Sequence, residues 1–135
     1  MTAFLKLYAV SVAAFLALDA LWLGLVARDF YRDRIGDLLR PEPRWTAAAL
    51  FYALFVAGIV LFVTLPALER SSLARAVGFG AFFGLVTYAT YDLTNLAVLE
   101  GFPAVVAVVD LAWGAAISAA VAAAGYASAD WLGIA

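Results

Sequence analysis

Four long apolar stretches limit what this chain can fold into more than any other feature. They cover roughly residues 5–27, 46–65, 75–98 and 104–127, and each is close to the ~20 residues that a helix needs to cross about 30 Å of hydrocarbon. Polar and apolar residues do not alternate in them as they do in β-strands. Because the lipid core offers the backbone no hydrogen-bond partners, each stretch must satisfy its own backbone groups as a helix. The sequence therefore predicts an all-α fold, an integral membrane four-helix bundle that forms a single domain over residues 1–135.

The composition supports a membrane protein and excludes several kinds of site. Hydrophobic residues make up 67% of the chain and charged residues only 13%, about half the charged fraction of a soluble domain. The chain has no cysteine and no histidine, which excludes disulfides, zinc–thiolate centres and histidine-ligated haem. A net charge of −2 gives no basic surface for nucleic acid. We therefore expect membrane lipids and no nucleic acid as partners, and the sequence identifies no cofactor.

The connection between the first two spans, residues 28–45, is the only substantial one. It carries five arginines and four acidic residues, and its apolar residues recur at i, i+4, i+7 and i+8, the spacing of one helix face. These residues are Tyr31, Ile35, Leu38 and Leu39. The pattern predicts a short amphipathic helix that continues the first span along the membrane surface and ends before Pro41. A solvated, charged turn is the alternative.

The remaining connections are short and contain residues typical of helix boundaries. Pro66 is expected to end the second span, because proline disrupts a helix interior. Ser71 or Ser72 can cap the third span. Glycine is favoured just after a helix and proline in the first turn of the next, so Gly101 and Pro103 predict a tight antiparallel hairpin between the third and fourth spans.

Small residues predict close contacts between helices. Gly80 and Gly84 are four residues apart, and alanines recur along the fourth span. Such faces let helix backbones approach each other in a membrane. We expect ordinary helix packing here and assign these residues no further function.

The distribution of cationic residues predicts the orientation. Five arginines lie in the first connection, whereas Lys6, Arg70 and Arg75 lie near the N-terminus and the second connection. The positive-inside rule places the more basic connections in the cytoplasm. We therefore expect a multi-pass protein of the bacterial inner membrane with both termini in the periplasm.

Three aspartates, Asp19, Asp92 and Asp110, interrupt the otherwise apolar spans. A charged side chain at the bilayer centre costs roughly 2.5–3.5 kcal/mol even on a lenient scale, so such residues usually face a bundle interior. No Lys, Arg or His lies at a comparable depth along the spans. Asp92 and Asp110 are each nine residues from Gly101, which puts both about 9–13 Å below the same surface in a tight hairpin. Asp19 lies at a similar depth near the end of the first span, so the sequence predicts one layer of three carboxyl groups.

Aromatic and amide side chains fall in the same layer. A tyrosine of the second span enters it, and two tyrosines and an asparagine share one face of the third span with Asp92. Each of the other two aspartates is followed three residues later by a tryptophan on the same side of its helix. The candidate ligand- or cation-binding pocket comprises Asp19, Trp22, Tyr52, Tyr88, Tyr91, Asp92, Asn95, Asp110 and Trp113.

Five segments, spread over essentially the whole chain, carry a likeness to a known family. They are Asp19-Ala-Leu-Trp22-Leu-Gly24, Arg28-Asp29-Phe30-Tyr31, Leu65-Pro66-Ala67-Leu68, Tyr88-Ala-Thr-Tyr91-Asp92-Leu-Thr94-Asn95 and Asp110-Leu-Ala-Trp113-Gly114. They resemble a family of small bacterial membrane proteins known only as the domain of unknown function 2177 family. The resemblance implies a four-span inner-membrane protein without an assigned activity, so no catalytic residue is carried over.

Three functions remain open. In the first and favoured one, the pocket binds or transports a proton, a hard cation or a small amphipathic ligand, because oxygen ligands suit hard cations and aromatic faces suit quaternary amines. In the second, the chain is a membrane enzyme or an accessory factor in lipid or fatty-acid modification, with paired carboxyl groups dividing acid and base roles. In the third, it is a structural bundle that contacts a partner protein. Four helices are few for enclosing a pathway, so a homodimer is also expected.

Overall fold

The computed structural model describes residues 1–134, which form four long helices and no strand. The helices able to span a membrane are Thr2–Val26, Trp45–Glu69, Leu73–Val98 and Ala104–Ser128. They agree with the predicted spans to within four residues at every end. The predicted all-α membrane bundle is confirmed.

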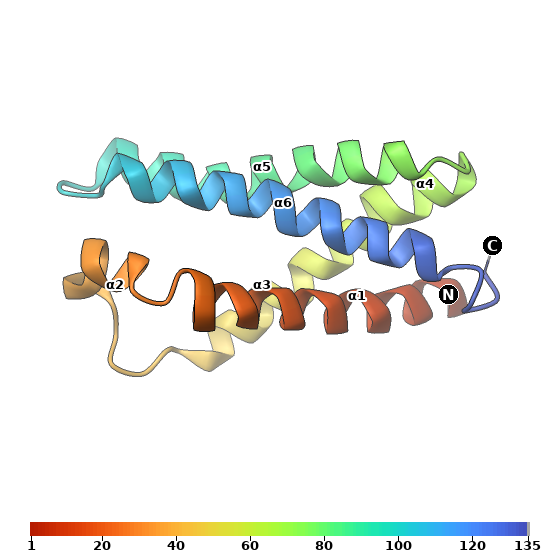
Figure 1. Ribbon diagram of the computed structural model, residues 1–135, viewed down its shortest axis with the longest axis horizontal. Coiled ribbons are helices and arrows are strands. Elements are labelled where there is room, and N and C mark those ends of the chain that lie inside the picture. Colours follow the sequence, from red (N-terminus) through yellow and green to blue (C-terminus); the bar gives the residue numbers. More distant parts are fainter. Residues whose placement is uncertain (135) are drawn as a thin grey trace.

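Shorter elements interrupt or connect these spans. In chain order the described elements are α1 (Thr2–Leu21), the π-helical turn η1 (Trp22–Val26), α2 (Phe30–Ile35), the 3₁₀ turn η2 (Gly36–Leu38), α3 (Trp45–Ile59), the π-helical turn η3 (Val60–Thr64), α4 (Leu65–Glu69), α5 (Leu73–Val98) and α6 (Ala104–Ser128). Figure 1 shows α5 and α6 side by side, with α1 and α3 on one side of this pair. Both termini lie at one end of the bundle, and α2 lies at the other end with the turn between α5 and α6 (Figure 1).

The second span continues through Pro66, so the prediction that this proline ends it is wrong. The helix passes from α3 into η3 and then into α4, which has Pro66 in its first turn. Proline lacks an N–H group and clashes with the carbonyl four residues earlier in an α-helix. The wider π-helical turn directly before it breaks that pairing, which lets the helix continue. The helix ends at Glu69, shortly before Ser71, whose φ is 49°.

The other predicted boundaries are close to those observed. The Ser72 hydroxyl caps α5 by accepting a hydrogen bond from the Arg75 backbone N–H at 3.1 Å. Gly101 has a φ of 76°, a left-handed conformation that glycine adopts without steric cost. Pro103 precedes α6 as its N-cap and does not lie in its first turn. The two helices form the predicted hairpin.

Glycines bring α5 and α6 into backbone contact. A Cβ atom added to Gly80 would lie 3.0 Å from the Ser118 carbonyl oxygen, and one added to Gly84 would overlap the Gly114 carbonyl. Gly114 itself lies against the ring of Tyr88. Close packing of this kind holds membrane helices together, because lipid supplies no hydrophobic force between them.

The main core fills the centre of the bundle and stops short of the end that carries α2. Its buried members are Phe15, Phe55, Val56, Ile59, Val63, Ala67, Ala76, Ile117, Val121 and Ala122. The half-buried rings of Tyr52, Tyr88 and Trp113 pack at its edge. The core therefore forms a floor beneath the region in which the three aspartates lie.

The first connection contains a short helix, as predicted, but the helix has a different course. Phe30, Tyr31 and Ile35 of α2 pack against a small cluster made by Phe102, Val106 and Ala107. Leu38 is 66% exposed and Leu39 47% exposed, because Gly36 begins the 3₁₀ turn η2 and ends the apolar face. In place of one amphipathic helix with four apolar residues on its face, a short α2 packs against the start of α6.

Candidate ligand-binding cavity

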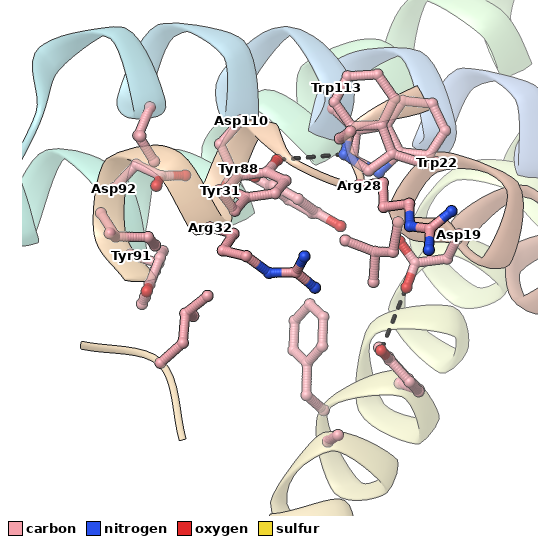
Figure 2. A pocket seen from close by; sticks show the side chains of 18 residues that line it. Asp19, Trp22, Arg28, Tyr31, Arg32, Tyr88, Tyr91, Asp92, Asp110 and Trp113 are labelled. Carbon is pink, nitrogen blue, oxygen red and sulfur yellow. Dashed lines mark hydrogen bonds between the residues drawn. The ribbon is translucent and has the colours of Figure 1, made fainter. Parts of the chain in front are cut away.

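A cavity of about 550 Å³ lies at the end of the bundle that carries α2, within the usual size range of ligand sites. It is bounded by α1, α2, α3, α5 and α6, and Figure 2 shows its lining side chains. Eight of the nine predicted pocket residues line it: Asp19, Trp22, Tyr52, Tyr88, Tyr91, Asp92, Asp110 and Trp113. The three aspartates of three different helices therefore share one cavity.

Asn95 is the predicted pocket residue that does not line the cavity. It follows Asp92 by three positions, which rotates it about 60° around the helix axis and moves it about 4.5 Å towards the turn. Tyr88 and Tyr91, which were also predicted, line the cavity from α5. Of the predicted face of this helix, Tyr88, Tyr91 and Asp92 line the cavity and Asn95 does not.

Two of the carboxyl groups are held by tyrosines from neighbouring elements. The Tyr52 hydroxyl donates to Asp19 Oδ2 at 3.2 Å, and the Tyr31 hydroxyl donates to Asp110 Oδ1 at 2.8 Å. Trp22 Nε1–H in turn donates to the Tyr31 oxygen at 3.2 Å. These bonds join α1, α2, α3 and α6 around the cavity.

The indole rings of Trp22 and Trp113 form one wall. Their centroids are 4.5 Å apart and their planes differ by 7°, and Figure 2 shows the stacked pair beside Arg28. The sequence placed each tryptophan three residues after an aspartate, on the same helix face. The structure brings the two faces together, so the stacked pair connects α6 to η1, which continues α1.

Asp92 differs from the other two aspartates. Its side chain is fully buried, and neither carboxyl oxygen has a hydrogen-bond partner among residues 1–134. Its carboxyl group neighbours that of Asp110. Buried polar groups are nearly always paired in proteins, so an unpaired carboxyl group at this position is costly to stability.

Two arginines reach the cavity, and this corrects the expectation that no cation accompanies the carboxyl groups. Arg28 and Arg32 line the cavity, and Figure 2 shows both guanidinium groups directed into it. The Arg32 guanidinium lies 3.5 Å from the Asp29 carboxylate, but both side chains are about 70% exposed. Exposed ion pairs of this kind contribute little to the stability of the fold. Arg28 forms no ion pair within residues 1–134.

The two arginines were missed because only the apolar residues of the first connection were placed on a helix face. Arg28, Tyr31, Arg32 and Ile35 follow the spacing i, i+3, i+4, i+7. Arg28 lies in the turn before α2, and Tyr31, Arg32 and Ile35 lie on α2 itself, so one short segment brings both cations to the cavity. The arginines were present in the sequence, but no local pattern showed that α2 packs on the start of α6.

Tyr31 connects α2 to the cavity wall. Burial raises the pKa of the Tyr31 phenol above its ordinary value, and the neighbouring carboxyl groups of Asp110 and Asp92 raise it further. The phenol therefore stays protonated at neutral pH and remains a donor to Asp110. Its bond adds to the packing of Phe30 and Ile35 on the start of α6.

We expect Tyr31→Phe to loosen α2 without unfolding the bundle. The change removes the donor to Asp110 and leaves the Trp22 indole N–H without its acceptor. Side-chain hydrogen bonds in membrane proteins contribute about 0.6 kcal/mol on average and up to about 1.7, so amide exchange across residues 28–40 should accelerate about 3- to 20-fold. Hydrogen-exchange mass spectrometry measures this directly. Tyr8→Phe, which removes a bond to the Ala53 carbonyl, is the control. Equal exchange rates across residues 28–40 in the two variants would contradict a stabilising role for the Tyr31–Asp110 bond.

The cavity offers carboxylate acceptors, phenol donors, aromatic faces and two guanidinium groups. Among residues 1–134 no group of three or more Asp, Glu, His or Cys is close enough to hold one metal ion. An organic ammonium group needs no such cage, because it binds against aromatic faces beside carboxylates. The arrangement therefore fits an organic cation in chemical terms.

Comparison with known proteins identifies a family but no activity. No curated protein and no solved structure matches the chain significantly. A sequence model of one family, DUF2177, described as a predicted membrane protein, matches residues 4–127. The match covers nearly all of the four spans and every residue that lines the cavity, so the chain belongs to the DUF2177 family of predicted membrane proteins.

Proposed function

We propose that this protein binds a small amphipathic ligand whose polar head carries a cationic amine. The observation that supports it most strongly is the composition of one cavity. Three intramembrane carboxyl groups, four tyrosines and a stacked pair of tryptophans line the same space of about 550 Å³. Chance burial of separate aspartates does not produce such a collection.

The chemistry of the lining favours an amine over a proton or a hard metal cation. An ammonium group is attracted to carboxylates, and aromatic faces bind it with about 2 kcal/mol or more where water is excluded. Asp19 and Asp110 each retain free acceptor capacity after their tyrosine bonds, because a carboxylate can accept about four. A ligand with an apolar part also suits the largely hydrophobic remainder of the lining.

The cavity mouth is proposed to face the cytoplasm. The end with α2 carries the five arginines of the first connection, against three cationic residues towards the other end. The positive-inside rule then puts both termini in the periplasm of a bacterial inner membrane. A cytoplasmic mouth would expose the ligand head to that compartment.

The two cavity tryptophans provide a direct test. The chain has four tryptophans, so Trp45→Phe with Trp131→Phe leaves only Trp22 and Trp113. In lipid nanodiscs, dodecyltrimethylammonium should change their fluorescence saturably. Adding Asp19→Asn and Asp110→Asn together should weaken this binding at least ~tenfold, since each tenfold step corresponds to 1.4 kcal/mol.

The matched control is Asp37→Asn, which alters an exposed aspartate outside the cavity lining. It should bind the probe as the parent protein does. If the probe only partitions without saturation, or binds equally to the Asp19/Asp110 double variant, the proposed site is wrong. Asparagine preserves the side-chain shape, so misfolding does not explain an effect specific to these positions.

A further inference from the structure

A second, smaller cavity lies next to the first, between α3 and α5. It measures about 280 Å³ and is lined by Phe51, Thr87, Tyr88, Tyr91 and Asp110. Four of these five residues also line the main cavity, so the two spaces adjoin each other across these side chains. Phe51 is 44% exposed and Tyr91 57% exposed, which leaves the smaller cavity, here called the side groove, open between α3 and α5.

The side groove is apolar in practice. The Thr87 hydroxyl bonds the backbone carbonyls of its own helix, to Phe83 at 2.9 Å and to Gly84 at 3.1 Å. Its polar atom is therefore already satisfied within α5. One turn closer to the termini, the rings of Phe55 and Phe83 stack at 5.7 Å and close the space between α3 and α5. The groove thus has a closed inner end and an open flank, the shape needed for an alkyl chain.

The main cavity is lined by positive charge at its α2 side and by carboxyl groups on the spans. Arg28 and Arg32 lie at the α2 side, whereas Asp19, Asp92 and Asp110 lie on the spans. A ligand with an amine alone would leave Arg28 without a counter-charge and Arg32 with only its exposed contact to Asp29. Guanidinium groups bind phosphate and carboxylate through paired hydrogen bonds, so an anionic group next to the amine complements both halves of the site.

We propose that the occupant is a single-chain zwitterionic amphipath that enters sideways from the bilayer between α3 and α5. Its chain lies in the side groove, its amine meets the carboxyl groups and its anionic group meets Arg28 and Arg32. This rests on the function proposed above, of which it specifies the ligand class and the route of entry. The side groove, at about 280 Å³, is assigned to one alkyl chain.

Probes with one chain and different heads test the charge arrangement. We would compare dodecylphosphocholine, dodecyltrimethylammonium and dodecyl phosphate at concentrations below micelle formation, using the same tryptophan fluorescence in nanodiscs. Dodecylphosphocholine should bind most tightly. Arg28→Gln with Arg32→Gln should weaken its binding ~tenfold or more, and should leave dodecyltrimethylammonium binding unchanged or tighter. Arg40→Gln, outside the cavity lining, is the control.

A bulky residue in the side groove tests the route. Thr87→Trp should weaken the binding of dodecylphosphocholine at least ~tenfold. Phosphocholine without a chain, which should bind less tightly to begin with, should bind this variant and the parent protein equally. Val86→Trp places the same bulk on the neighbouring exposed position, outside the side groove, and should have no effect. Size-exclusion chromatography checks folding, and Thr87→Leu repeats the test with less added volume if Thr87→Trp aggregates.

The outcomes separate this inference from the proposed function. If dodecyltrimethylammonium binds in an Asp19- and Asp110-dependent way but the arginine variants and Thr87→Trp change nothing, the inference is overturned and the function stands. Tightest binding of dodecyl phosphate, or chain-free phosphocholine binding as tightly as the dodecyl form, also overturns it. If no probe binds saturably, the proposed function fails and the inference fails with it.

Discussion

Replacing Gly84 with leucine is expected to prevent the bundle from folding. A Cβ atom at this position would overlap the Gly114 carbonyl and the Ser118 hydroxyl of α6. Backbone atoms cannot rotate away as a side chain can, so α5 and α6 would have to separate along their contact. Overpacking a core costs typically about 1–3 kcal/mol, and a backbone clash in the most extensive helix contact should exceed that.

The measurement is the yield of monodisperse protein in mild detergent, together with its thermal unfolding followed by circular dichroism. Gly78→Leu is the matched control, because a Cβ atom there meets nothing within 4 Å on an exposed face of the same helix. It should express and unfold like the parent protein. Equal yields and melting temperatures for the two variants would contradict the close approach of α5 and α6.

The parts of the fold that lipid dictates could be predicted from the sequence. Each span must form its own backbone hydrogen bonds, so its length and apolar character were sufficient to place it. The hairpin at Gly101 was predictable because its signals are local. Equal counting from that turn then placed Asp92 and Asp110 beside each other, and the structure brings them to one cavity.

The parts that depend on contacts between distant segments could not be predicted. Pro66 has a local signal for a helix end, but η3 absorbs its effect. The course of α2 depends on the packing of Phe30 and Ile35 against Phe102 and Val106, which lie some seventy positions later in the chain. No local pattern carries that information.

This difference alters the chemistry inferred for the site. Depth counted along the spans found only acidic groups, which pointed to a proton, a cation or a small amphipathic ligand. Arg28 and Arg32 enter the same cavity from outside the spans, because α2 packs against the start of α6. A site that contains both signs of charge selects a different ligand from one that contains only carboxylates.

Replacing Asp92 with leucine is expected to stabilise the protein while weakening ligand binding. Leucine has the same branching as aspartate, and the site is fully buried with neither carboxyl oxygen paired among residues 1–134. Substituting a buried charged group with an apolar one of similar shape is often stabilising, by about 1–4 kcal/mol. The same change removes one of the three carboxyl groups that would attract an amine, so dodecyltrimethylammonium should bind less tightly.

Thermal unfolding and the tryptophan titration together test this pair of opposite effects. Asp92→Asn serves as the control, since it keeps a buried polar group and should gain much less stability than Asp92→Leu. A leucine variant that is less stable than the parent would show that Asp92 has a structural partner, and it would contradict our assignment. Higher stability with weaker binding would mean that the chain keeps a destabilising carboxyl group for its ligand, as expected where function and stability compete. That combination distinguishes a binding site from a merely tolerated buried aspartate, because a tolerated residue can be replaced without any loss of affinity.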